Sequence, residues 1–270
     1  MKYLLLLATT LLLTAATGKW KLEDKAASKT FVHVPAGTLN GTEVKEFYIS
    51  KIEITNKQYR DFLKSMYESH RYEKWRDARV DTAQWRTYLT YNDPYANHYF
   101  QNPEYDIYPV VNVSHRGAQL YCEWLTENYN KTAKQKVEFR LPTEAEWMWA
   151  AKAGNKDATY PWEGDSLTYQ KKGKYFGYDL ANYKHYNALA LTVDKSTGKV
   201  DLTAPSLSFL PNKYDVWNMA GNVAEMTTDP SYTKGGGWAD EAPKIKIEHR
   251  EKYDGKASPN VGFRPVVVLK

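Results

Sequence analysis

The 270 residues of this chain give enough length for one large domain or two small ones. The net charge is +5 and no polybasic block occurs, so the charge does not indicate a nucleic-acid partner. Aromatic residues make up 14% of the chain, and rings with polar tips can build a core together. A single cysteine, Cys122, excludes an intrachain disulfide.

The first residues have the features of a secretory signal peptide at 1–18. Lys2 supplies a positive charge, residues 3–13 form an apolar run, and small residues allow cleavage between Ala16 and Gly18. The run is too short to span a bilayer, so we expect no transmembrane span after cleavage, with an uncleaved anchor as the alternative. Residues 19–30 are expected to form a charged leader before one domain at 31–270.

Two strands and a helix are predicted next. Residues 31–39 alternate as a strand that breaks at Pro35–Gly37, and residues 44–54 form a second extended run. Thr55 is placed to cap a helix, and Gln58 stands where a capping box requires it. The spacing of the following apolar residues predicts its buried face: Tyr59, Phe62, Leu63 and Met66.

Residues 67–110 are polar and aromatic, with little helical or strand period. They are predicted to be an insertion wrapped over the surface of the domain. A loop of this length inside a compact domain is usually functional or is ordered by its own packing.

Two further helices are predicted from their caps. Ser114 can begin one helix, on which Cys122 shares an apolar face with its neighbours and is expected to be inert packing. Thr143 and Glu146 form a second capping box, ahead of a helix that turns Trp147 inward.

The segment from Asp215 to Asp229 combines a small-residue turn with several oxygen donors. Gly221 permits a backbone conformation that a side chain would forbid. Asn218, Asn222 and Glu225 offer two amides and a carboxylate, a donor set that suits a hard cation such as calcium. The alternative is an Asn/Gly-rich turn inside the core, with no metal.

Four other segments accompany this turn: PAG at 35–37, EITNKQYRDFL at 53–63, RLPTEAEWMWAA at 140–151 and NVGFRPV at 260–266. In this order and spacing, the chain from about Phe31 to Val268 resembles the formylglycine-generating enzyme, or sulfatase-modifying factor, family. The resemblance implies an α+β fold, the formylglycine-generating-enzyme variant of the C-type-lectin-like fold, rich in loops with short strands and a few helices.

The same resemblance implies two structural calcium sites. For the second site, the family ligands map to the side chains of Asn218 and Glu225 and to the carbonyls of Gly221 and Val223. For the first site, Asn182 and the carbonyl of Tyr183 match. A later aspartate of that site does not align, because Gly198 stands at its position, with Asp194 and Asp201 nearby.

Active members of the family oxidise a substrate cysteine with copper held by two cysteines, since soft thiolates hold Cu(I). Asp240 and Ile245 stand about where that pair belongs, so no copper is expected. Related sulfoxide synthases hold iron with histidines of a separate helical domain, and no such helical histidine pairing occurs here. Trp238, Asp240 and Arg264 are predicted to contribute to a binding surface.

A narrower resemblance concerns residues 81–111, which are similar to sulfatase-modifying-factor-like envelope proteins of gliding motility and type IX secretion in Bacteroidetes. The predicted function is therefore an exported, non-catalytic, calcium-stabilised scaffold with protein partners, located in the periplasm or at the cell surface. One alternative is an oxidase of the formylglycine-generating type with an altered metal site. The other is a carbohydrate- or peptide-binding module of lectin type.

Overall fold

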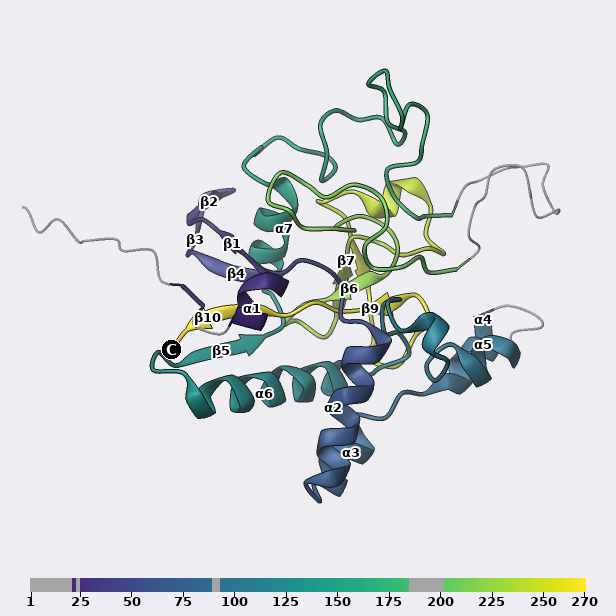
Figure 1. The fold of residues 1–270 in the computed structure, drawn as a ribbon. Coiled ribbons are helices and arrows are strands. Elements are labelled where there is room, and N and C mark those ends of the chain that lie inside the picture. The colour runs from purple at the N-terminus through teal and green to yellow at the C-terminus, as the bar shows by residue number, and fades with distance from the viewer. Residues whose placement is uncertain (1–20, 23–24, 89–92, 185–201) are drawn as a thin grey trace, which may run out of the picture.

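The computed structural model describes residues 21–22, 25–88, 93–184 and 202–270. It contains short strands, a few helices and long connecting loops, as the sequence predicts for an α+β chain (Figure 1). The signal peptide predicted at 1–18 lies outside the described residues. No described helix is long and apolar enough to cross a bilayer.

The first sheet places the last strand of the chain in its interior. Its order is β1 (Phe31–Val34), β4 (Phe47–Ser50), β10 (Val266–Leu269) and β5 (Val137–Arg140), and all neighbours are antiparallel. Because side chains alternate along a strand, each strand contributes to two cores. Val267 packs on one face with the residues of α6, whereas Val266 packs on the other face with those of α7.

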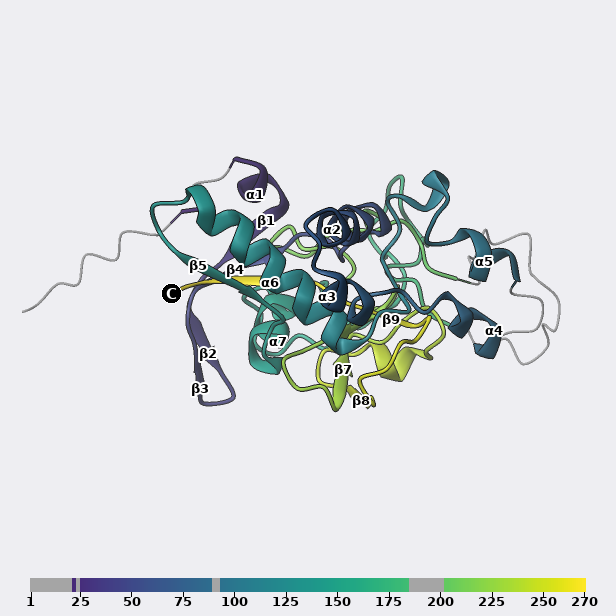
Figure 2. The ribbon, with the colours of Figure 1, turned by 90° about the horizontal axis from the view of Figure 1, so that it is seen from below.

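Three capped helices surround this sheet. They are α2 (Asn56–Glu68), α6 (His115–Thr132) and α7 (Glu144–Lys152). The predicted capping boxes at Thr55 and Thr143 and the predicted cap at Ser114 are all confirmed. Helix α6 lies along one face of the sheet and α7 lies on the opposite side (Figures 1 and 2).

A second sheet has the order β8 (Arg250–Lys252), β7 (Tyr232–Lys234), β6 (Ala224–Met226) and β9 (Val261–Gly262). Strands β6 and β9 pair in parallel, and the other pairs are antiparallel. A short hairpin joins β2 (Gly37–Leu39) to β3 (Thr42–Val44), and the 3-10 helix η3 spans Ala242–Ile245. The fully buried β6 brings Glu225 into the centre of the molecule.

The segment 67–110, in which the sequence shows little helical or strand period, contains several short helices in its described part. It forms α3 (Tyr72–Asp77), η1 (Thr82–Gln84), α4 (Trp85–Tyr88), α5 (Asp93–His98) and η2 (Pro103–Tyr105). Trp85 and Tyr99 are fully buried in a cluster with Trp238. Ring-to-ring packing at centroid distances of 4.9–6.2 Å orders this segment without any regular hydrophobic period.

The predicted leader at 19–30 is described at residues 21–22 and 25–30. Residues Lys25–Thr30 form helix α1, which leads directly into β1. Leu22 is buried in the same core cluster as α2 and α6. Leu22 and Ala27 thus contact the core from within this segment.

A clash test follows from the loop at Pro35–Gly37. A Cβ atom on Gly37 would lie 2.0 Å from the ring of Trp149, whose indole N–H donates to the carbonyl of Pro35. We expect Gly37→Ala to lower the free energy of unfolding by about 1–3 kcal/mol, because the ring must shift in a packed core. Urea denaturation measures the change.

The matched control is Thr38→Ala, an exposed change in the same strand, which should have little effect. In a double-mutant cycle, Trp149→Phe should offset part of the Gly37→Ala cost, because it removes the clashing atoms. Simple additivity of the two changes would contradict this packing argument.

Candidate functional site

The oxygen-rich turn lies between the two sheets and depends on left-handed backbone positions. Asn218, Gly221 and Asn222 have φ angles of 53°, 73° and 65°. A Cβ atom on Gly221 would lie 2.3 Å from the carbonyl oxygen of Asn182, so only glycine fits there. Asparagine tolerates the left-handed region better than most residues, which explains its use at the other two positions.

Glu225 and Arg264 form a fully buried ion pair at the end of this turn. The guanidinium donates to both carboxylate oxygens, at 2.7 Å from Nε and 2.6 Å from Nη2. The indole N–H of Trp147 donates to the same carboxylate at 2.8 Å. Burial opposes the guanidinium charge, but Glu225 and Glu53 outweigh it, so the pKa of Arg264 is raised.

Glu53 is the second buried carboxylate of this cluster, and the sequence analysis did not assign it a role. It accepts from the amides of Asn222 at 2.9 Å and Asn218 at 3.3 Å. Burial raises the pKa of its carboxyl from 4.5 to about 7, and repulsion from Glu225 adds to the shift while Arg264 opposes it. Glu53 lies two residues before the Thr55 cap, and no local sequence signal indicates that it is buried.

The cluster suits a hard cation by charge and by donor type. Two carboxylates, Glu53 and Glu225, face one guanidinium, so the ionised cluster carries one excess negative charge. Oδ1 of Asn218 is buried without a described hydrogen-bond donor. The described residues contain no group of three His, Cys, Asp or Glu, so a cation here would rely on amide and carbonyl oxygens.

The predicted first calcium site is only partly described. The amide of Asn182 donates to the carbonyl of Leu202 at 2.6 Å, and its own carbonyl accepts from Asn222 N–H at 2.7 Å. Tyr183 packs beside Tyr160 and Ile245. Asp194, Gly198 and Asp201 lie outside the described residues, so the ligand set proposed for this site stays a prediction.

The three residues predicted to form a binding surface make internal contacts in the structure. Trp238 is buried and donates to the carbonyl of Pro259 at 2.9 Å. Arg264 is fully buried in the ion pair with Glu225. The carboxylate of Asp240 accepts from Gly237 N–H at 2.9 Å and from the Asn260 amide at 2.6 Å. A role in ligand contact stays a prediction for all three.

The lone thiol is placed as the sequence predicts. Cys122 is buried on α6 in the core cluster that contains Tyr121 and Phe263. Burial raises the pKa of its thiol far above the ordinary range, and the neighbouring Glu123 adds to the shift. Such a thiol is held protonated and packs as a small apolar side chain.

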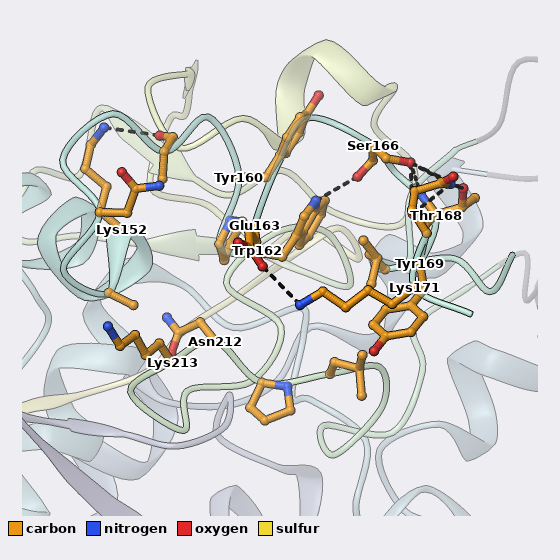
Figure 3. Close-up of a pocket in the computed structure, with 18 residues that line it drawn as sticks. Lys152, Tyr160, Trp162, Glu163, Ser166, Thr168, Tyr169, Lys171, Asn212 and Lys213 are labelled. Atoms are coloured by element: carbon orange, nitrogen blue, oxygen red, sulfur yellow. Dashed lines mark hydrogen bonds and ion pairs between the residues drawn. The ribbon is translucent and has the colours of Figure 1, made fainter. Parts of the chain in front are cut away.

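A pocket of about 610 Å³ opens in the loops that follow α7 (Figure 3). Tyr160 and Trp162 stack in it with parallel rings 5.0 Å apart. Lys171 pairs with Glu163 at 3.0 Å across the pocket. The sequence analysis assigned no role to this stretch. A second pocket, of about 760 Å³, lies between the β2–β3 hairpin and the start of α7.

The buried acid generates a pH prediction. The Glu53 carboxyl has a pKa of 4.5 as a free group and about 7 in the folded protein, so the folded state keeps a proton that the unfolded chain releases. The stabilisation that this bound proton gives the folded state is fully present below about pH 4.5 and is lost as the pH rises through about 7. The side chain introduced by Glu53→Gln is neutral at every pH. The free energy of unfolding of this variant should therefore change with pH by about 3 kcal/mol less than that of the parent.

The measurement is urea denaturation across this pH range in the presence of a chelator, which prevents a cation from replacing the proton. The control is Glu43→Gln, a change at an exposed carboxylate. If parent and Glu53→Gln lose stability in parallel as the pH rises, Glu53 does not hold the proton.

Comparisons with known proteins identify the family and the fold. A family model described as a sulfatase-modifying factor enzyme 1-like domain matches residues 10–269. The formylglycine-generating enzyme of Thermomonospora curvata is 34% identical over 155 residues, which cover 57% of this chain and 44% of that enzyme. The chain thus aligns with less than half of that relative's length.

A second relative is matched over nearly its whole length. The inactive C-alpha-formylglycine-generating enzyme 2 of Bos taurus is 25% identical over 305 residues, covering 93% of this chain and 92% of the relative. The crystal structure of CarF has a TM-score of 0.61, with 19% identity, over 89% of this chain and 98% of CarF. The fold predicted from the motifs is thereby confirmed. This chain belongs to the sulfatase-modifying factor enzyme 1-like domain family.

Proposed function

We propose that this chain is a non-catalytic, exported member of its family that acts as a calcium-stabilised scaffold for protein partners in the cell envelope. Gliding motility or type IX secretion is the proposed setting, on the resemblance of residues 81–111. The observation that carries the non-catalytic part is the chemistry of Asp240 and Ile245, which stand where the family's copper-binding cysteines belong.

Both positions are used for internal structure. Asp240 accepts hydrogen bonds from Gly237 and Asn260, and its side chain also lies 3.6 Å from the ammonium group of Lys244. Ile245 is fully buried. A carboxylate selects hard cations over Cu(I), and an isoleucine offers no ligand. The full-length match to a relative named as inactive supports the same proposal.

Copper binding and turnover test this proposal. We expect no stoichiometric Cu(I) binding in competition with a colorimetric chelator, because the thiolate pair is missing. We also expect no formylglycine on a C-x-P-x-R peptide, measured by mass spectrometry after incubation with copper and oxygen. The T. curvata enzyme serves as the positive control in both assays.

The alternative is an oxidase with an altered metal site, and the same experiment distinguishes it. Aldehyde formation by the parent chain that is lost in Asp240→Ala would replace the scaffold proposal with the oxidase. The matched control is Glu241→Ala, which removes a neighbouring carboxylate without touching the hydrogen bonds of Asp240.

Calcium is the proposed structural cofactor of the turn at Asn218, Gly221, Val223 and Glu225. We expect calcium, but not an equal concentration of magnesium, to raise the free energy of unfolding above its value in chelator. A ligand at one hundred times its Kd adds about 2.7 kcal/mol, because it binds only the folded state. Thermal and urea unfolding measure the difference.

Asn218→Asp sharpens the calcium test. It places a carboxylate where Oδ1 of Asn218 has no described donor, so stability should fall in chelator and recover with calcium. The control is Asn222→Asp, because Oδ1 of Asn222 already accepts from Ala204 N–H at 2.7 Å. Calcium should rescue the first variant and not the second. A parent protein indifferent to calcium would exclude the metal.

A binding module of lectin type is the second candidate function, and the pocket of Figure 3 favours it. Parallel aromatic rings such as Tyr160 and Trp162 offer an apolar platform, and the surrounding loops supply polar groups. Titration with oligosaccharides, monitored through tryptophan fluorescence, tests this candidate. Saturable binding lost in Trp162→Ala would support it.

A further inference from the structure

The loop after the pocket carries a run of exposed aromatic side chains. Phe176 and Tyr178 are 59% and 61% exposed, and Tyr175 is also exposed. Isolated exposed rings are ordinary, but neighbouring ones in a single loop mark an interaction surface. We refer to residues Lys171–Tyr178 as the aromatic loop.

The base of the aromatic loop is held in place by backbone hydrogen bonds. Tyr169 N–H donates to the carbonyl of Tyr178, and Gly177 N–H donates to the carbonyl of Tyr169, both at 2.8 Å. A β-bridge between Thr168 and Asp179 closes the loop below these bonds. The rings are therefore presented on a fixed turn rather than on a loose tether.

Positive charge accompanies the rings. Lys171, Lys172 and Lys174 lie in the loop, and no acidic residue occurs between Ser166 and Tyr178. Lys171 is paired with Glu163, but Lys172 and Lys174 make no ion pair with any residue that the structure describes. The ammonium group of Lys174 lies 5.3 Å from the ring of Tyr175, so charge and apolar surface coincide.

We propose that the aromatic loop binds the surface of an anionic lipid bilayer. Tyrosine and phenylalanine rings settle at the boundary between headgroups and acyl chains, and lysines nearby are attracted to anionic headgroups. This role goes beyond the proposed scaffold function and does not depend on calcium or on the copper positions.

The shape of the loop favours a lipid surface over a soluble small ligand. The segment after α7 projects at the top of Figure 1. Residues Lys172–Tyr178 line neither of the two described pockets, whereas Lys171 borders the first one. Rings on a projecting turn do not form a pocket that could enclose a small ligand, but they can insert into the interface of a lipid bilayer.

The experiment is flotation with phosphatidylcholine vesicles, prepared with and without phosphatidylglycerol. Two forms of the protein are compared: the full chain, and a shorter form without residues 1–18, because their apolar run would bind lipid on its own. The shorter form keeps Leu22, the first described residue of the core. We expect both forms to float with anionic vesicles, and the shorter form to be released by salt because lysine attraction is screened.

Paired variants locate the binding surface. Phe176→Ser/Tyr178→Ser should weaken partitioning of the shorter form by about tenfold or more, since two rings no longer leave water. Lys172→Glu/Lys174→Glu should remove the preference for phosphatidylglycerol. The matched control is Ile107→Ser/Leu207→Ser, two exposed apolar residues outside the loop, 61% and 62% exposed, and it should bind like the parent.

Several outcomes would overturn the proposal. One is that the shorter form does not associate with anionic vesicles. Another is association that survives in both loop variants or is lost equally in the control pair. Since all six positions are exposed, unchanged melting temperatures will show that the variants are folded. Loop-dependent capture of a protein without vesicle binding would assign the surface to a protein partner and overturn the lipid proposal.

Discussion

The buried pair of Glu225 and Arg264 connects most of the parts of this molecule. Arg264 also donates to the carbonyls of Ser50 at the end of β4 and of Trp217 in the oxygen-rich turn. Glu225 lies on β6 and accepts from Trp147 on α7. One charged group thus joins both sheets, a helix and the turn, and a buried charge of this kind is stable only while its partners stay in place.

Local signals made part of the fold predictable. The caps at Thr55, Ser114 and Thr143 each depend on residues three positions apart, so the sequence alone locates the three main helices. The left-handed turn at Gly221 was also predictable, because glycine permits a backbone conformation that a side chain would forbid. By contrast, Glu53 meets Asn222 across 169 positions, and no short-range pattern indicates that contact.

Aromatic residues account for most of the differences between expectation and structure. Trp238 and Arg264 were predicted to contribute to a binding surface. In the structure Trp238 packs in the cluster of Trp85 and Tyr99, and the pair with Glu225 buries Arg264. Aromatic rings can pack against one another at many angles and spacings, so their packing produces no regular period in the sequence. The candidate site was therefore found by its turn residues, and a position inside the core was the alternative interpretation of that turn.

The position of β10 between β4 and β5 has a consequence for synthesis. A chain that emerges from its N-terminus can form α2, α6 and α7 early, because their contacts are local. The central sheet stays open until residues 266–269 have been made, and Arg264 arrives only just before them. Until then Glu53 and Glu225 have no guanidinium to neutralise them. Closure of the central sheet and neutralisation of the buried carboxylates thus both wait for residues 264–269.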